Sequence, residues 1–470
     1  MVSEKLLSWF RTGRARNPHS LLRYEELDRS RGKMEPHVRS HELNMLVLML
    51  LMGLVVFTQG RWQRSSSIRC SDNGPRVSQR RMMARHRRVI GELLLVTAAV
   101  LAGIVVVEAA MRLVGADDAL VWVPDPRVGW HQIPGAQRRW TSEGRGWVAI
   151  NTLGYRDRER RLERLPGTHR VAVFGDSMTE GVQVNLDETF CYLVEEKFAR
   201  GAQRVEVLNF GVNGYSPVQE LLVMMEEVPR YRPDLVILAL YLDNDVSGMH
   251  PKLNVSQWGA PYAVVERGNL RIEYSAAEAS YEEFHRLPLY WLRKHSAIYR
   301  SISNWRWRQH AMQAEYRGSG SFPVRHRLYE VDLRPEWRVA WHSLERVLLE
   351  FKRVAEEHGV EFVVLSMPAP QVVDRHRWEA LVESFPAMRR VQWDLDGPER
   401  RLSEFASENG IRLIQTSDHF KDALDGPPLF FDGLGHMTAR GHQIMATLLS
   451  QFLSTRLKTI RAIDVATRAR

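Results

Sequence analysis

The chain has 470 residues, too many for one small domain and enough to bury a sizeable core. Its composition, 44% hydrophobic and 26% charged, is typical of folded globular proteins, and its two cysteines exclude a disulfide framework or a cysteine-rich zinc site. A net charge of +9 would suit a nucleic-acid-binding protein, but the excess is confined to residues 1–88, which carry 18 Lys+Arg and 7 Asp+Glu. The rest of the chain carries 47 basic and 49 acidic residues, so we expect no nucleic-acid partner.

The basic N-terminal region, residues 1–88, shows no regular periodicity, and we predict that it is poorly ordered. Its one apolar run, residues 43–58, is marginal in length for a membrane span. It therefore fits a short span, an interfacial helix or a signal-like segment equally well. Met82 or Met83 would also serve as a start, which leaves open whether residues 1–80 belong to the mature protein.

A second and stronger apolar run covers residues 89–114, and its centre, Leu93 to Val107, has no charged side chain. A helix of about 20 such residues crosses a bilayer, so we predict a transmembrane anchor. The five arginines of residues 80–88 stand directly before it, and such clusters stay on the cytoplasmic side. This orientation places the remaining chain outside the cytoplasm, in a periplasmic or other extracytoplasmic space. The alternatives are a buried core helix and a cleaved signal peptide.

The anchor is followed by the main domain, residues 120–455, and by a basic C-terminal tail, residues 456–470. The domain opens with an irregular or short-stranded collar, residues 121–157, and then alternates short apolar strands with amphipathic helices, which predicts an α/β fold with a parallel sheet of about five strands covered on both faces. An insertion at about 246–335 interrupts the alternation, and it fits a packed helical subdomain or a lid that faces substrate or membrane. The expected strands are Val171–Phe174, Val205–Asn209, Leu235–Leu240, Phe362–Ser366 and Ile411–Gln415.

Polar motifs follow these strands. The first strand leads into GDSMTEG with Ser177, the second into NFGVNG with Gly214, and the third into LDND with Asn244, while FFDGLGHMTARGH near the C-terminus contains His436. Because the carboxyl ends of parallel strands meet at one edge of a sheet, we expect these residues to share a pocket. A serine, a histidine, a carboxylate and N–H donors for an oxyanion are the groups that acyl transfer requires.

These four motifs, in this order and spacing, resemble the signature blocks of the SGNH (GDSL-type) hydrolase superfamily over roughly residues 120–455. The resemblance implies a flavodoxin-like three-layer α/β/α sandwich. It also implies that Ser177 is the nucleophile, that His436 is the general base, and that the N–H of Ser177, Gly214 and Asn244 form the oxyanion hole.

Two positions depart from that pattern. Leu242 stands where the third block usually has glycine, which alters a turn and leaves Asn244 available. The acid that orients the histidine usually lies three residues before it, and here that residue is Gly433. Asp432 is the expected acid if the loop bulges at its glycines. Otherwise the enzyme works as a Ser–His dyad or another carboxylate serves.

We therefore expect a membrane-anchored serine esterase whose substrate is an ester-containing small molecule, a lipid or an acylated glycan. No pair of histidines has metal-ligand spacing, His442 suits packing at the start of a helix, and we expect neither a metal nor a cofactor. One alternative is an O-acyltransferase that acts on cell-surface polysaccharide. The other is a non-catalytic envelope protein that uses the fold for binding.

Overall fold

The computed structural model describes residues 75–113, 120–199, 204–254, 259–286, 288–303, 305–306 and 322–468. The chain divides into two units, with the boundary between Asp117 and Asp118, and each is described by itself. The apolar run at residues 43–58 and Cys70 lie outside the described residues.

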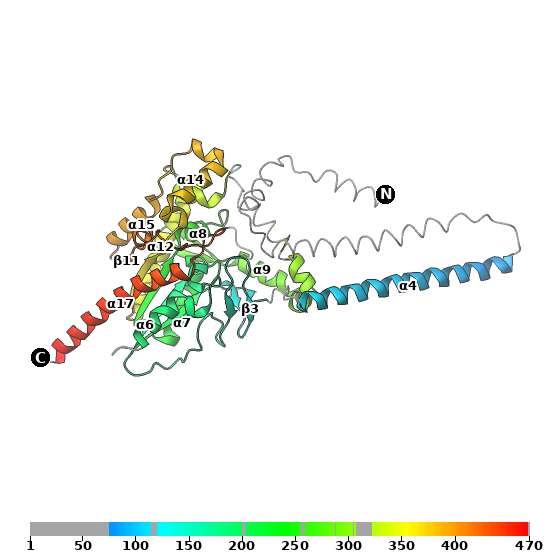
Figure 1. Ribbon diagram of the computed structural model, residues 1–470, viewed down its shortest axis with the longest axis horizontal. Helices are drawn as coiled ribbons and strands as arrows, with labels where there is room; N and C mark the ends of the chain where they lie inside the picture. Colours follow the sequence, from blue (N-terminus) through cyan, green and yellow to red (C-terminus); the bar gives the residue numbers. More distant parts are fainter. Residues whose placement is uncertain are drawn as a thin grey trace. The chain divides into compact units, whose positions relative to one another are not determined.

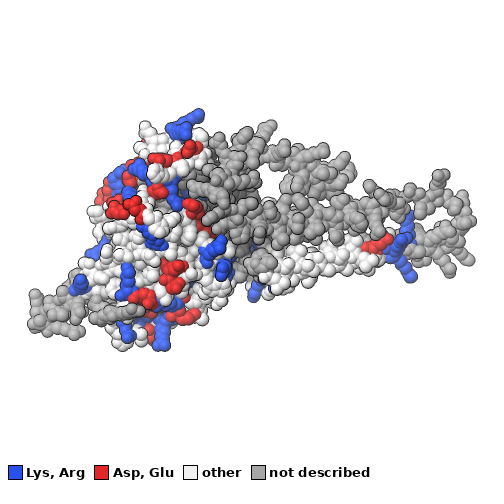
Figure 2. All heavy atoms as spheres, in the orientation of Figure 1, with Lys and Arg blue, Asp and Glu red and all other residues white. Residues whose placement is uncertain are grey.

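The described part of the first unit is one long helix, α4 (Pro75–Leu113). Its segment Arg85–Leu113 is long and apolar enough to cross a membrane, and none of its most apolar stretch is buried. Figure 2 shows it as an extended surface almost without charged side chains between its ends. By length and composition, α4 therefore has the properties that the sequence predicts for an anchor.

The second unit is built on a five-stranded parallel sheet (Figure 1). The strand order is β11-β10-β7-β5-β6. The chain first forms β5, next to one edge, then the edge strand β6, and it then adds β7, β10 and β11 on the other side of β5. This is the flavodoxin-like order, and it confirms the predicted fold. The strands are β5 (Thr168–Gly175), β6 (Arg204–Gly211), β7 (Leu235–Leu240), β10 (Glu361–Ser366) and β11 (Arg412–Ile414).

Helices cover both faces of the sheet, because alternate strand side chains point to opposite sides. Phe174, Leu238 and Val364 pack on one side with α7 (Pro217–Tyr231), α12 (Pro335–Glu357) and α15 (Gly397–Glu408). Val173 and Ile237 pack on the other side with α6 (Phe190–Ala199) and α17 (Ala439–Arg468). The shorter helices are α5 (Ser177–Glu180), η1 (Leu186–Glu188), α13 (Pro370–Val373), α14 (Arg375–Ser384), η3 (Pro386–Arg390) and α16 (Ser417–Lys421).

The insertion contains more strand than the sequence predicts. It begins within α8 (Leu242–Gly248), forms an antiparallel hairpin from β8 (Tyr262–Glu266) and β9 (Asn269–Glu273), and continues into α9, α10 and η2. Those last elements are α9 (Ser275–His285), α10 (Leu289–His295) and η2 (Val324–Tyr329). At the other end of the domain, α17 continues through the predicted tail as far as Arg468.

The predicted collar consists of two small antiparallel hairpins that precede the sheet. The first pairs β1 (Trp122–Asp125) with β2 (Gly129–Gln132), and the second pairs β3 (Gln137–Arg139) with β4 (Trp147–Ala149). Both hairpins contribute side chains to the region around the carboxyl end of β5.

Candidate active site

Three of the expected site residues follow neighbouring strands. Ser177 comes after β5, Gly214 after β6 and Asn244 after β7, and β5 pairs with both of the other strands. The topology therefore gathers all three at the carboxyl edge of the sheet, where open α/β folds bind ligands.

His436 reaches Ser177 from the far end of the chain. Its Nε2 lies 2.8 Å from the Ser177 Oγ, a hydrogen-bond distance for a nucleophile and its base. The loop that carries His436 is held by an isolated bridge between Phe430 and Met437 and by the Phe431 N–H, which donates to the His436 carbonyl at 2.8 Å. Both side chains are largely shielded from solvent, as Ser177 is 7% exposed and the His436 side chain 13%.

The carboxylate partner of His436 comes from the collar. Glu143 Oε2 is hydrogen-bonded to His436 Nδ1, and Glu143 Oε1 accepts the Gly435 N–H at 2.9 Å. One carboxylate thus contacts both the imidazole and the backbone of its loop. Serine, histidine and glutamate form a continuous chain of the kind that makes a serine nucleophilic.

Asp432, the acid expected from the sequence, does not occupy that position. Its side chain is 83% exposed, and one oxygen lies 3.4 Å from the Arg377 guanidinium. The glycines around it were expected to bend the loop so that Asp432 reached His436. Instead, the positive φ of Gly435, +85°, accompanies an N–H that binds Glu143. The expectation for Asp432 is therefore corrected: the acid on the histidine is Glu143.

Glu143 is missing from the sequence-based candidates because no fixed spacing connects it to the histidine. It lies 293 positions before His436, in a loop rather than after a strand of the main sheet. The only local signal is its place before a Gly-Arg-Gly segment, residues 144–146, in a collar that lacks periodicity.

That Gly-Arg-Gly segment fixes Glu143 by lying directly on the loop after α5. Arg145 and Gly146 N–H groups donate to the Gln183 carbonyl at 3.1 and 3.2 Å. A Cβ on Gly144 would lie 2.2 Å from that same oxygen, and the residue has a φ of +69°. Only glycine fits both conditions, so the loop geometry depends on it.

Arg156, a buried arginine of the collar, connects the collar to α5, the helix that begins with Ser177. Arg156 is fully buried, and its guanidinium donates to the carbonyls of Glu180, Gly181 and Val184 at 2.8, 3.0 and 2.6 Å and to that of Trp147 at 3.2 Å. Burial lowers the pKa of Arg156 to about 10, which still leaves it charged at neutral pH. A charged donor that satisfies several carbonyls resists displacement, so it holds β4 against the end of α5.

The expected oxyanion donors have suitable positions. Ser177 is the first residue of α5, so its N–H has no partner within the helix. The Asn244 Nδ2 donates one hydrogen to Asp176 Oδ2 at 2.6 Å, which orients the amide and leaves its second hydrogen for a ligand. Gly214 is exposed in a turn between buried residues and has a φ of +76°.

Several carboxyl groups are buried in this region, and three of them are Asp176, Glu220 and Asp245. Burial raises the pKa of Asp176, Glu220 and Asp245, and the charge of Asp176 raises those of the other two further. Among the residues that the structure describes, neither carboxyl oxygen of Glu220 has a hydrogen-bond partner. A buried carboxylate without a donor or a cation is strongly disfavoured, so Glu220 is the group of the three that gains most from protonation.

The remaining titratable candidates belong to packing. His442 lies in α17, where its ring stacks on Phe190 and its Nδ1 accepts the Phe190 N–H at 3.3 Å. Burial lowers the pKa of His442 to about 3, so it is neutral at physiological pH. Within the described ranges, no cluster of three His, Cys, Asp or Glu residues is arranged to hold a metal ion.

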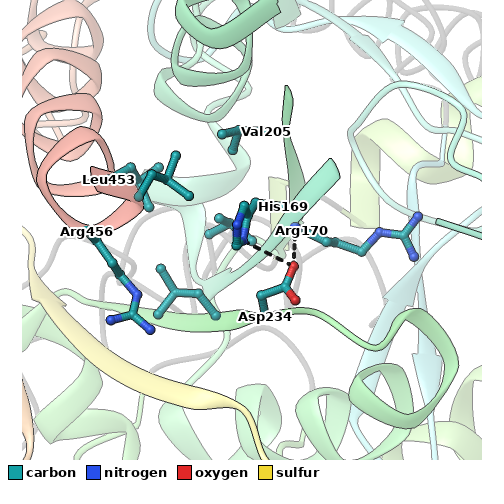
Figure 3. A pocket seen from close by; sticks show the side chains of 9 residues that line it. His169, Arg170, Val205, Asp234, Leu453 and Arg456 are labelled. Carbon is teal, nitrogen blue, oxygen red and sulfur yellow. Dashed lines mark hydrogen bonds and ion pairs between the residues drawn. The ribbon is translucent and has the colours of Figure 1, made fainter. Parts of the chain in front are cut away.

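A separate hollow lies at the opposite, amino-terminal end of the sheet (Figure 3). It is lined by His169 and Asp234 from the strand starts and by Leu453 and Arg456 from α17. Asp234 accepts the Arg170 N–H at 2.8 Å and lies 3.6 Å from the His169 ring. None of the residues around Ser177 lines it, so it is not where an ester would meet the nucleophile.

Residues 173–270, a segment that contains Ser177, Gly214 and Asn244, match the GDSL-like Lipase/Acylhydrolase family. No curated protein matches the chain in sequence.

Among solved structures, the chain is similar to the psychrotrophic esterase EstA from Pseudoalteromonas sp., at 9% identity and a TM-score of 0.29 over 62% of this chain and 99% of that one. It is also similar to the acetyl xylan esterase AlAXEase, at 12% identity and a TM-score of 0.33 over 60% and 97% of the two chains. A lipase/acylhydrolase from Enterococcus faecalis matches at 14% identity and a TM-score of 0.30 over 61% and 96%.

Proposed function

We propose that this chain is an SGNH-type esterase that cleaves esters through an acyl intermediate on Ser177, with the match of residues 173–270 to the GDSL-like Lipase/Acylhydrolase family as support. The observation that carries this proposal is the hydrogen-bonded series Ser177–His436–Glu143, with 2.8 Å between the serine oxygen and the imidazole. A histidine held by a carboxylate on one nitrogen presents the other as a base to the serine hydroxyl.

In the first half of the reaction, Ser177 Oγ attacks the ester carbonyl carbon while His436 Nε2 takes the hydroxyl proton. The carbonyl oxygen becomes an oxyanion, which the N–H groups of Ser177 and Gly214 and the amide of Asn244 stabilise. The imidazolium is stabilised by Glu143. When the tetrahedral intermediate collapses, the bond to the alcohol breaks, and His436 returns the proton to the leaving oxygen.

In the second half, a water molecule attacks the acyl-serine and gives one proton to His436. Collapse of this second intermediate breaks the Ser177–acyl bond, returns the proton to Ser177 Oγ and releases the carboxylic acid. The contact of Glu143 with His436 favours a catalytic over a non-catalytic protein, because it supplies the carboxylate that is absent three residues before His436.

We further propose that α4 anchors the enzyme in a membrane with the catalytic unit outside the cytoplasm. The support is the 29-residue apolar stretch Arg85–Leu113 and the arginine cluster at its amino-terminal end. Protease treatment of right-side-out and inverted membrane vesicles, followed by detection of a C-terminal tag, tests the orientation. We expect digestion of the catalytic unit only in the right-side-out vesicles, and digestion only in inverted vesicles would contradict the proposal.

The catalytic proposal is tested on the full chain in detergent with a fluorophosphonate probe and p-nitrophenyl acetate. We expect the wild type to be labelled on Ser177 and to release p-nitrophenol, and Ser177→Ala to do neither. Ser384→Ala, which changes an exposed serine on α14, is the matched control and should behave as the wild type. Activity that survives in Ser177→Ala would refute the assignment. Addition of sugar acceptors to the same assay shows whether the acyl group passes to water or to a hydroxyl.

A further inference from the structure

Glu180 is a buried carboxyl group beside the nucleophile that the proposed mechanism does not use. It ends α5, the helix that begins with Ser177, and its side chain is fully buried. Its Oε1 accepts the Gln132 amide N–H at 2.7 Å, and its Oε2 accepts the backbone N–H of Asn213 at 2.5 Å. A carboxylate that accepts one N–H on each oxygen is well matched to its charged form.

The other side of Asn213 is also held. Its carbonyl accepts the indole N–H of Trp130, a collar residue on β2, at 3.0 Å. The same indole ring lies 3.4 Å from the position that a Cβ on Gly214 would occupy. The Asn213 residue is therefore fixed at its N–H by Glu180 and at its C=O by Trp130.

This arrangement has a direct consequence for the oxyanion hole. The carbonyl of Asn213 and the N–H of Gly214 belong to the same peptide group, and a peptide group is planar. A hydrogen bond that fixes the direction of the carbonyl therefore also fixes the direction of the N–H. Because oxyanion donors act through their alignment with the developing charge, the direction of this N–H affects the rate.

We propose that Glu180, in its ionised form and together with Trp130, is a positioning residue that directs the Gly214 N–H toward the oxyanion. The inference rests on the proposed ester hydrolysis at Ser177. Protonation of Glu180 would place a hydrogen on one carboxyl oxygen, which then faces an N–H donor and loses that hydrogen bond. With the hydrogen on Oε2, the turn that carries Gly214 would lose its hydrogen bond to Glu180, while the Trp130 and Tyr215 contacts remain.

The surroundings of Glu180 shift its pKa so that this protonation occurs near neutral pH. Burial, with a smaller contribution from the charge of Asp176, raises the pKa of Glu180, while the N–H of Asn213, the charge of Arg156 and the amide of Gln132 oppose the rise. The net pKa is about 7. As pH falls below about 7, the carboxyl group becomes protonated, so the turn that carries Gly214 loses its hydrogen bond to Glu180. We therefore expect kcat to fall as pH decreases through about 7, in part because of Glu180.

The experiment is a series of pH profiles of p-nitrophenyl acetate hydrolysis by the full chain in detergent, with Glu180→Gln, Trp130→Phe and the wild type. Loss of an oxyanion donor costs about 10²- to 10³-fold in kcat, and for a misdirected donor we expect about a 10- to 100-fold loss. KM should stay within about twofold, because the interaction strengthens only in the transition state. Glu180→Gln should also lose the part of the acid limb that Glu180 causes, whereas Trp130→Phe should lower kcat and keep that limb.

Glu226→Gln on α7 is the matched control, since this exposed glutamate pairs only loosely with Arg127, at 3.7 Å, and should give the wild-type profile. A wild-type kcat and acid limb in Glu180→Gln would overturn the inference. If that variant does not fold, an unchanged kcat in Trp130→Phe would overturn it as well. A wild type that is neither labelled by fluorophosphonate nor active would instead refute the proposed function.

Discussion

The carboxyl edge of the sheet and the collar both contribute to the site, but they differ in how their residues are positioned. Ser177, Gly214 and Asn244 each follow a strand, so the order of strands in the sheet brings them together. Glu143 and Trp130 lie on small hairpins before the sheet and reach the site through individual contacts. In the proposed mechanism the sheet edge supplies the nucleophile and the oxyanion donors, while the collar supplies Glu143, which contacts His436, and Trp130, which binds the Asn213 carbonyl.

This difference predicts different responses to mutation. In the proposed mechanism the residues at the sheet edge contact the reacting atoms, so loss of Ser177 should abolish the reaction and loss of an oxyanion donor should lower kcat about 10²- to 10³-fold. Collar residues act through other groups, so their loss should lower the rate and change its pH dependence while the fold remains intact.

The largest effect on kcat is expected in the C-terminal motif FFDGLGHMTARGH, which contains both His436 and His442. His436→Ala removes the base and should lower kcat about 10⁴- to 10⁶-fold, as observed when one member of a catalytic triad is lost. His442→Gln removes a buried ring that stacks on Phe190, so it should lower the melting temperature and change kcat less than about threefold. Steady-state kinetics and thermal unfolding of both variants check this, and a catalytic loss in His442→Gln at intact fold would break the division between the two histidines.

A smaller effect is expected from the glycine that lets the collar loop approach the active site. Gly144→Ala would push the loop from the Gln183 carbonyl and displace Glu143, and a shift of about 1 Å costs about 10²-fold in rate. Gly167→Ala is the matched control, because its φ of +73° is similar but nothing lies within 4 Å of the added Cβ. It should lose about 1 kcal/mol of stability and keep its activity. Equal kcat/KM values in the two variants would show that the close contact does not position Glu143.

The smallest effect concerns stability rather than rate. The pKa of Glu220 is raised in the folded state by burial, so its contribution to stability is full below the ordinary glutamate pKa and is lost as pH rises toward the folded-state value. Glu220→Gln cannot ionise, so as pH rises above the ordinary glutamate pKa it should lose less unfolding free energy than the wild type. Chemical denaturation at several pH values measures this, with the exposed Glu226→Gln as control. Parallel curves for wild type and Glu220→Gln would contradict the assignment.

The same comparison explains what could be predicted from the sequence. Buried parallel strands have a clear apolar pattern, so the five-stranded sheet and the residues after its strands follow from local sequence. The acid could not be predicted in this way, because tertiary contacts place Glu143. Gly144 and Gly146 lie against the Gln183 carbonyl, and Arg156 donates hydrogen bonds to backbone carbonyls of the same region. Asp432 was favoured because it is close to His436 in sequence, yet its side chain faces solvent and Arg377.

The β8–β9 hairpin in the insertion was also not predicted from the sequence. Its strands are only partly buried, and they alternate too weakly with exposed positions to show a period of two.

The most direct test of the central claim is to compare kcat/KM for Glu143→Gln and Asp432→Asn in the full chain at one pH. Glutamine keeps the size of Glu143 but removes the negative charge that stabilises the imidazolium, and loss of such an acid lowers the rate by up to about 10⁴-fold. We predict a loss of about 10²- to 10⁴-fold in Glu143→Gln and a change of less than about twofold in Asp432→Asn. The reverse result, with Asp432→Asn inactive and Glu143→Gln unaffected, would contradict the assignment of the collar glutamate as the acid that orients His436.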